Sequence, residues 1–194
     1  GIQSASDNFV ISVDAINDAP VSQNGTAAAS EDGVVISGQL IADDVDRDDD
    51  STTLTCSLVS GTGDGTVIIK PDGSFSFDPG TDFQDLAAGE TRDVSFTFEA
   101  TDRHGAVSNV STVVVTVTGI NDDPVSQNGT AVATEDGAVI HGQLVADDVD
   151  SDDDPTTLTY SLVSGTSEGT ATVNPDGSFS FDPGTDFQDL AAGE

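Results

Sequence analysis

The sequence predicts an all-β chain built from tandem antiparallel Greek-key β-sandwiches. Apolar and polar residues alternate in short runs such as Val94 to Ala100, which is the period of a strand with one buried face. Turn residues interrupt these runs about every eight to twelve residues, and no amphipathic helix pattern is found. The sequence also repeats itself, because Pro20 and Pro124 are equivalent and lie 104 positions apart (124 − 20). These patterns together indicate sandwich units in series.

The repeat predicts the domain organisation. Val21 to Thr26 recurs as Val125 to Thr130, and the two copies stay in register without a gap. We predict that residues 1–16 are the last strand of a preceding repeat and residues 17–120 one complete repeat. Residues 121–194 would then be a second repeat that lacks its last two strands. We therefore expect the chain to belong to a longer array of such units.

The complete repeat contains the elements of one sandwich, and about seven strands are expected. Its strand-like runs are Val34 to Leu40, Leu54 to Leu58, Val67 to Ile69, Phe75 to Phe77, Val94 to Ala100 and Thr112 to Thr118. Pro71-Asp72-Gly73 predicts a tight turn, since Gly accepts a positive φ there. One helical turn is expected at Phe83 to Leu86. Cys56 alternates with apolar neighbours, so we predict a buried, unreactive thiol.

The charge balance narrows the classes of partner. The 194 residues carry 36 acidic and 4 basic side chains, for a formal net charge of −32. Nucleic acid is excluded as a partner because phosphate binding needs clusters of Lys and Arg. No apolar run approaches the ~20 residues of a membrane-spanning helix, so no membrane insertion is expected. Such self-repulsion predicts that divalent cations accompany the folded state.

The acidic residues concentrate in one loop of each copy. Asp43 to Asp50 recurs as Asp147 to Asp154, and each run lies between two predicted strands. Ca²⁺ takes six to eight oxygen ligands from carboxylates, amides and carbonyls, which this loop and the Asn-Asp linkers supply. The alternative is a solvated acidic loop, as in proteins adapted to salt. The concentration of acid in few places favours calcium.

The end of the complete unit resembles a cadherin repeat. The resemblance rests on three motifs, which are Ala100-Thr101-Asp102, the valine-rich run Val113 to Thr118, and the linker Ile120 to Pro124. The whole unit resembles more closely the bacterial cadherin-like modules called VCBS repeats, which occur in giant secreted adhesins of the RTX type. The resemblance implies tandem Ig-like/cadherin-like antiparallel Greek-key β-sandwiches. Further matching motifs are Glu31-Asp32-Gly33, Asp44-Val45-Asp46, Pro71 to Phe75 and Phe83 to Gly89.

The resemblance also implies Ca²⁺ as the cofactor, held where two modules meet. The implied ligands at the central junction are Glu31 with Asp82 or Asp85, Asn121, Asp122, Asp148 and Asp150. The implied ligands at the upstream junction are Asn17, Asp18, Asp44, Asp46 and Asp102. Glu135 takes the place of Glu31 in the second copy. Asp82 to Asp85 departs from the acidic triplet of true cadherins, and no glycine-rich RTX nonapeptide occurs in the chain.

These implications predict a calcium-rigidified extender segment of a secreted bacterial surface adhesin, which projects a distal ligand-binding domain in adhesion and biofilm formation. Export by type I secretion to the cell surface is expected. The expected partners are neighbouring repeats of the same polypeptide, and the chain is expected to be a monomer. One alternative is that the N-terminal strand of one molecule adds to the second repeat of another. A second functional alternative is a carbohydrate- or protein-binding module.

Catalysis is not expected. A glycosidase needs a cleft with paired carboxylates and usually aromatic platforms, whereas the chain has no Trp and a single Tyr, Tyr160. His104 and His141 have no nucleophile or metal-ligand spacing around them in the sequence. The sequence therefore favours a structural module over an enzyme.

Overall fold

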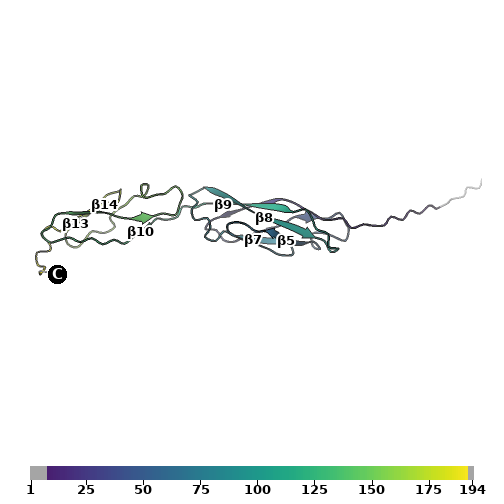
Figure 1. Cartoon of the computed structure of the whole chain (residues 1–194), viewed down its shortest axis with the longest axis horizontal. Helices are drawn as coiled ribbons and strands as arrows, with labels where there is room; N and C mark the ends of the chain where they lie inside the picture. The colour runs from purple at the N-terminus through teal and green to yellow at the C-terminus, as the bar shows by residue number, and fades with distance from the viewer. Residues whose placement is uncertain (1–7, 192–194) are drawn as a thin grey trace, which may run out of the picture. The chain divides into compact units, whose positions relative to one another are not determined.

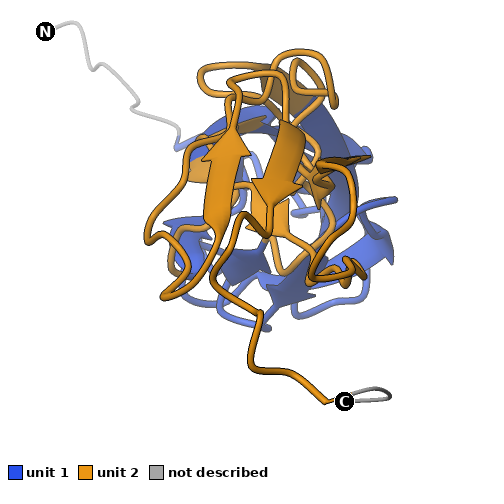
Figure 2. Ribbon diagram, turned by 90° about the vertical axis from the view of Figure 1, so that its left-hand side faces the viewer, with its two compact units in different colours: residues 1–28, 35–78, 93–116 blue, residues 29–34, 79–92, 117–194 orange. Residues whose placement is uncertain are grey.

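A computed structural model describes residues 8–191 of the chain, and residues 1–7 and 192–194 lie outside the described part. The all-β prediction is confirmed, because every regular element in residues 8–191 is a strand. No helix in this part is long and apolar enough to cross a bilayer. The chain divides into two compact units (Figure 2). The first holds the chain up to Ala28, Val35–Asp78 and Asp93–Thr116, and the second holds Ala29–Val34, Pro79–Arg92 and the chain from Val117 onward.

The first copy of the repeat contains nine strands, several of which are labelled in Figure 1. They are β1 (Val21–Ser22), β2 (Gly25–Ser30), β3 (Ile36–Gln39), β4 (Ala42–Asp43), β5 (Thr55–Ser60), β6 (Thr66–Ile69), β7 (Ser74–Asp78), β8 (Thr91–Thr101) and β9 (Ser111–Thr118). A four-stranded sheet has the order β2-β9-β8-β5, and a three-stranded sheet has the order β3-β7-β6. β1 and β4 form a separate pair. The sequence patterns predicted most of these strands, but not β1, β2 and β4.

Burial in the first copy follows the two-residue alternation of the strands. In β9 every second residue is buried, beginning at Ser111, and Phe75 and Phe77 of β7 are buried in the same alternating way. The rings of Phe75 and Phe96 lie 5.2 Å apart between centroids. Each buried Phe contributes about 1.5–3 kcal/mol through removal of its surface from water. Cys56 is buried as predicted, and burial raises the pKa of its thiol.

Two turn predictions had different outcomes. The chain does turn at Pro71 to Gly73, where Gly73 has a φ of +77° and its N–H donates to the Lys70 carbonyl at 2.9 Å. The expected helical turn at Phe83 to Leu86 is instead an irregular turn, in which Leu86 N–H donates to the Phe83 carbonyl at 3.0 Å. Phe83 and Leu86 are both buried. Packing of these two side chains in the core outweighs the helix propensity of the segment.

The second copy repeats one sheet of the first. Its strands are β10 (Val125–Ser126), β11 (Ile140–Gln143), β12 (Ala146–Asp147), β13 (Thr170–Val173) and β14 (Ser178–Asp182). β11, β14 and β13 form a three-stranded sheet in which Gly142 pairs with Phe179, as Gly38 pairs with Phe75 in the first copy. A Cβ atom at Gly38 or Gly142 would lie within 2.4 Å of the Phe ring opposite, so the pairing requires glycine.

The other sheet does not form in the second copy. Residues 129–134 and 159–164 are the counterparts of β2 and β5, yet neither segment is a strand. In the first copy β2 and β5 lie next to β9 and β8, whose counterparts are not among residues 121–194. A strand needs a neighbour to satisfy its backbone N–H and C=O groups. Within residues 121–191 the two segments therefore have no strand neighbour.

Candidate metal centre

A buried carboxylate lies beside the linker that joins the two copies. Glu31 follows β2 and is 1% exposed. Its N–H donates to the Thr118 carbonyl at 3.1 Å, and its Oε1 accepts a hydrogen bond from Ile120 N–H. Its Oε2 has no hydrogen-bond partner. A buried charged oxygen without a partner is costly, so this position calls for a cation or a proton.

The acidic loop of the second copy meets the same linker. Asp122 N–H donates to Oδ2 of Asp150 at 2.9 Å, and Asp150 N–H donates to Oδ1 of Asp148 at 3.0 Å. Asp150 is 3% exposed. Oδ1 of Asp150 and Oδ2 of Asp122 are buried and have no hydrogen-bond partner, as is the case for Oε2 of Glu31. The linker and the loop thus each present an unpaired carboxylate oxygen.

The electrostatics show that these carboxylates are neighbours. Burial raises the pKa of the Glu31 carboxyl, and the hydrogen bond from Ile120 opposes this. The charges of Asp122, Asp32 and Asp150 then raise the pKa of Glu31 further. The pKa of Asp122 is raised by loss of solvent and by the charges of Asp32, Asp150, Asp148 and Asp123. Such mutual repulsion is relieved when a hard cation lies among the oxygens.

Asp153 joins this cluster, although it was not among the predicted ligands. Carboxylate oxygens of Asp148, Asp150 and Asp153 all lie within 4.8 Å of one another. The backbone explains this, because Asp153 N–H donates to the Asp150 carbonyl at 3.2 Å and so closes a turn between the two residues. The spacing of three residues from Asp150 is a signal in the sequence, but the acidic run offers several residues of the same kind nearby.

The remaining predicted ligands at this junction differ in their surroundings. The Asp85 side chain forms an ion pair with Arg92 at 2.6 Å, which lowers the pKa of Asp85, while its backbone carbonyl accepts a hydrogen bond from Ser151 N–H at 3.0 Å. Asp82 is exposed and lies in the turn after Pro79. Asn121 donates from Nδ2 to the carbonyl of the following residue. Glu135, the counterpart of Glu31 in the second copy and not a predicted ligand of this junction, also has a buried Oε2 without a hydrogen-bond partner.

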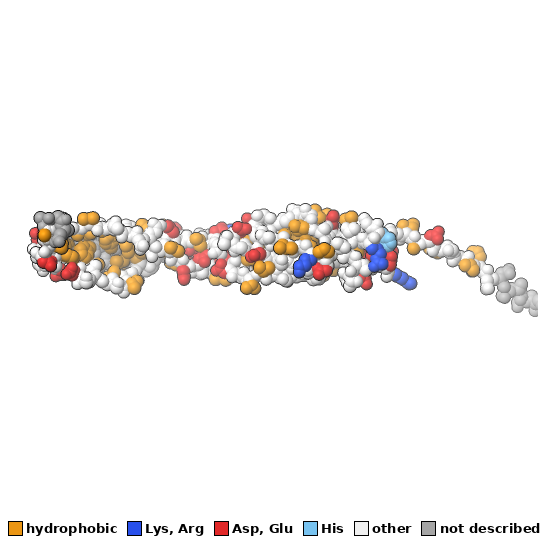
Figure 3. Space-filling model, turned by 90° about the horizontal axis from the view of Figure 1, so that it is seen from below, with side chains coloured by type: hydrophobic (Ala, Val, Ile, Leu, Met, Phe, Trp, Pro, Cys, Tyr) orange, Lys and Arg blue, Asp and Glu red, His pale blue; other side chains and the backbone are white. Residues whose placement is uncertain are grey.

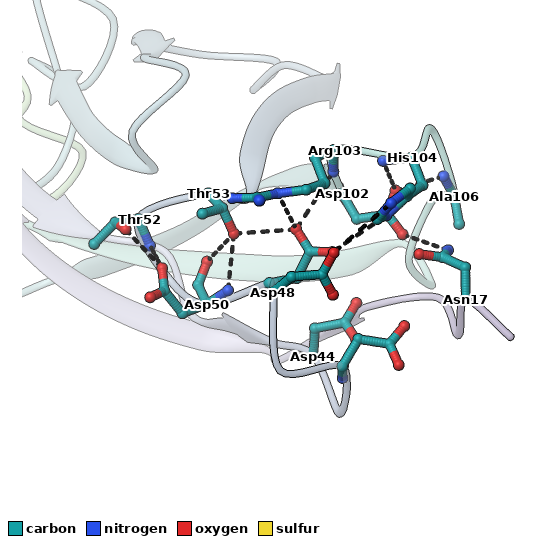
Figure 4. Close-up of polar contacts among 12 residues, drawn as sticks. Asn17, Asp44, Asp48, Asp50, Thr52, Thr53, Asp102, Arg103, His104 and Ala106 are labelled. Atoms are coloured by element: carbon teal, nitrogen blue, oxygen red, sulfur yellow. Dashed lines mark hydrogen bonds and ion pairs between the residues drawn. The ribbon is translucent and has the colours of Figure 1, made fainter. Parts of the chain in front are cut away.

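The upstream linker has the same arrangement, drawn in part in Figure 4. Asp18 N–H donates to Oδ2 of Asp46 at 2.8 Å, and Asp46 N–H donates to Oδ1 of Asp44 at 2.9 Å. Nδ2 of Asn17 donates to Oδ2 of Asp102 at 2.8 Å, which lowers the pKa of Asp102 together with backbone hydrogen bonds. Oδ2 of Asp44 is buried and has no hydrogen-bond partner. The five predicted upstream residues thus lie together.

A histidine lies beside the upstream cluster, although the sequence around it has no metal-ligand spacing. Nδ1 of His104 is 3.6 Å from Oδ2 of Asp49, and Nε2 is 3.7 Å from Oδ2 of Asp48. The Asp49 side chain is fully buried, and its Oδ1 is 3.4 Å from Nε of Arg103. The acidic loop that holds Asp48 and Asp49 and the turn that holds His104 are far apart in the sequence, so no local spacing could reveal this contact.

Two family profiles match the chain, one for each copy of the repeat. The profile of a family described as bacterial cadherin-like domain matches residues 17–119, which is more than half of the chain. The profile of a family described as bacterial Ig domain matches residues 121–192. No curated protein matches the chain.

Several solved structures are similar to the chain at low sequence identity, and the first of these shares the fold. The structure of Drosophila N-cadherin EC1-4 is 18% identical, with a TM-score of 0.55 over 86% of this chain and 40% of that one. Protocadherin Gamma B2 extracellular cadherin domains 3-6 are 16% identical, with a TM-score of 0.49 over 86% of this chain and 39% of that one. An endo-fucoidan hydrolase from glycoside hydrolase family 107 is 16% identical, with a TM-score of 0.39 over 89% of this chain and 25% of that one. The chain therefore spans well under half of each of these structures.

Proposed function

Because the chain belongs to the bacterial cadherin-like domain family, we propose that it is an extender segment whose linkers are made rigid by Ca²⁺. The proposal includes the finer assignment to VCBS-type repeats of a giant secreted RTX adhesin at the bacterial cell surface. In that setting the segment would project a distal ligand-binding domain in adhesion and biofilm formation, after type I secretion. Its partners would be the neighbouring repeats of the same polypeptide.

One observation carries the calcium proposal. Three segments that are distant in the sequence each contribute a buried carboxylate oxygen without a hydrogen-bond partner, from Glu31, Asp122 and Asp150. A solvated acidic loop would expose its oxygens to water, whereas these are shielded from it. Hard cations with oxygen ligands match such a set, and a cation offsets the burial and the mutual repulsion that raise the pKa values of Glu31 and Asp122.

The residues that would hold the ion explain why binding would stiffen the linker. Glu31 comes from the end of β2, Asp122 from the linker, and Asp148, Asp150 and Asp153 from the loop of the second copy. An ion shared by all three segments would remove most of the bending freedom of a short hinge, and Pro124 already restricts it. The upstream residues Asn17, Asp18, Asp44, Asp46 and Asp102 would serve the preceding linker in the same way.

Stiffening can be measured directly as a distance distribution. We would replace the buried Cys56 by Ser and attach spin labels to cysteines at the exposed positions Thr66 and Thr172, one in each copy. Double electron–electron resonance should give a narrow distribution in calcium and a broad one in excess chelator. Distributions of equal width in the two conditions would contradict the rigid-extender proposal. Circular dichroism on the same samples separates loss of rigidity from loss of folding.

The assignment of Asp153 gives a prediction of its own. Asp153→Asn should weaken calcium binding several-fold, because one charged ligand becomes a neutral amide that still fits the turn. Asp152→Asn is the matched control, since Asp152 is the adjacent exposed residue of the same loop and removes the same charge. Isothermal titration calorimetry with calcium checks both variants. Equal weakening by the two substitutions would mean that only net charge matters.

A further inference from the structure

Basic and histidine side chains are scarce in this chain, which has four Lys and Arg residues and two His. On the face drawn in Figure 3, histidine and basic side chains gather in one place beside acidic ones. Figure 4 shows the turn that carries Arg103 and His104 beside the acidic loop that carries Asp48. We call Asp48, Asp49 and His104 the His–Asp cluster.

Asp49 contributes a buried oxygen that no donor satisfies. Its side chain is fully buried, and its Oδ1 accepts hydrogen bonds from Thr53 Oγ1 at 3.1 Å and from Arg103 N–H at 3.5 Å. Its Oδ2 is buried and has no hydrogen-bond partner. That oxygen lies 3.6 Å from Nδ1 of His104, which is longer than a hydrogen bond. A buried carboxylate oxygen in this state is costly unless a cation or a proton joins it.

The ligand atoms of the His–Asp cluster are spaced for one small metal ion. One such atom from each of its three residues lies within 4.8 Å of the other two. Ligands of a tetrahedral zinc ion lie roughly 3.4 Å apart, because the bonds to zinc are about 2.0–2.2 Å long. The 3.6 Å between Asp49 and His104 is close to this separation. Oδ2 of Asp48 is 3.7 Å from Nε2 of His104, and the Asp48 side chain is 55% exposed, so it can adjust to the ion.

Backbone hydrogen bonds hold both sides of the cluster in place. Oδ1 of Asp102 accepts hydrogen bonds from the N–H groups of His104 and Ala106, each at 2.8 Å, which fixes the turn that carries the imidazole. Asp49 N–H donates to the Asp46 carbonyl at 3.2 Å and closes a turn in the acidic loop. These residues all belong to the first compact unit, so the cluster needs no residue of the second copy.

We propose that Asp48, Asp49 and His104 bind a divalent first-row metal ion that accepts a nitrogen ligand, with Zn²⁺ as the probe. Imidazole nitrogen suits zinc and its neighbours in the series, whereas calcium takes oxygen ligands. The two carboxylates balance the charge of such an ion. Arg103 contacts the other oxygen of Asp49 and therefore does not occupy the place of the metal. The site differs in chemistry from the proposed calcium sites and does not depend on them.

The second copy offers an all-oxygen cluster for comparison. Asp152 and Asp153 are the counterparts of Asp48 and Asp49. Carboxylate oxygens of Asp153 and two further aspartates form that cluster, which contains no histidine. Zinc should therefore favour the first copy, while the all-oxygen cluster suits calcium.

Isothermal titration calorimetry with zinc tests the proposal on the 194-residue chain, in millimolar calcium that fills the oxygen sites. His104→Gln should weaken zinc binding by at least about tenfold, since even residues that only support a metal ligand typically contribute about 10–100-fold. His141→Gln is the matched control and should leave the affinity unchanged, because His141 is the other histidine and is exposed on β11. The His104 side chain is 49% exposed, so its replacement should leave the fold intact, which circular dichroism checks.

A second measurement locates the ion. In NMR spectra of the ring nitrogens, the resonances of His104 should shift as zinc is added, and those of His141 should not. Asp48→Asn should weaken zinc binding, whereas Asp152→Asn, the same change at the counterpart, should not. Absence of zinc binding in calcium would overturn the proposal. So would binding that His104→Gln leaves unchanged, which would place the ion among carboxylates, or equal shifts of both histidines, which would indicate nonspecific binding.

Discussion

Removal of calcium is expected to lower the melting temperature by about 10 to 20 °C for each site that is lost. An ion present at a hundredfold excess over its Kd stabilises the folded state by about 2.7 kcal/mol, and each kcal/mol shifts the midpoint of a domain of this size by about 4–8 °C. Extracellular calcium modules typically have Kd values of about 10⁻⁴ to 10⁻³ M, so about 10 mM calcium reaches a hundredfold excess at the tighter end of that range. Calorimetry in about 10 mM calcium and then in excess chelator measures the shift at constant ionic strength.

Magnesium is the control for this melt. Mg²⁺ demands a near-ideal octahedral site and retains its water, so it should restore little of the lost stability at the same concentration. Full rescue by magnesium would indicate that the acidic groups respond to charge screening in general. Identical curves in calcium and chelator would mean that the carboxylates form a solvated surface, and the proposed function would then fail.

Replacement of Glu31 by Gln is expected to have opposite effects with and without calcium. The amide oxygen can still accept the hydrogen bond from Ile120, so the substitution removes charge and leaves the shape. In calcium we expect about tenfold weaker binding, equivalent to about 1.4 kcal/mol, and a lower melting temperature. In chelator the variant should melt at the same temperature as the unaltered chain or higher, because a buried unpaired charge is gone.

Glu168→Gln is the matched control, since Glu168 is an exposed residue in the same copy as the acidic loop. It should change neither the calcium affinity nor the melting temperatures in calcium and in chelator. If Glu31→Gln lowers the melting temperature equally in calcium and chelator, Glu31 stabilises the fold by packing and hydrogen bonding. The charge would then have no role in cation binding.

The stability difference between Glu31→Gln and the unaltered chain should depend on pH with a definite sign. The folded-state pKa of Glu31 is raised, so its contribution to stability in chelator is present at low pH and is lost as the pH rises through the folded-state value. The Gln side chain in the Glu31→Gln variant does not titrate in this pH range. The advantage of the variant in chelator should therefore grow between about pH 4 and pH 7, measured as the difference between the two melting temperatures.

The local patterns and the resemblance to cadherin repeats together indicated residues that lie close to one another in the structure. The Asn-Asp linkers and the Asp-x-Asp loops recur at one spacing, and the structure brings Asp122, Asp148 and Asp150 together as it brings Asp18, Asp44 and Asp46 together. Asp153 and His104 were missed for different reasons. Asp153 is one of several aspartates in a run, so its sequence position does not single it out. His104 approaches its neighbours only through the pairing of distant strands.

The sequence by itself determined the fold class, the period of the repeat and the position of the acidic loops. These depend on alternation and turn chemistry within short stretches, which any segment carries wherever it lies. Only the tertiary structure decided which carboxylates are shielded from water and that residues 129–134 form no strand. Burial and strand formation both depend on a neighbour from another part of the chain, and the identity of that neighbour is not encoded in the segment itself.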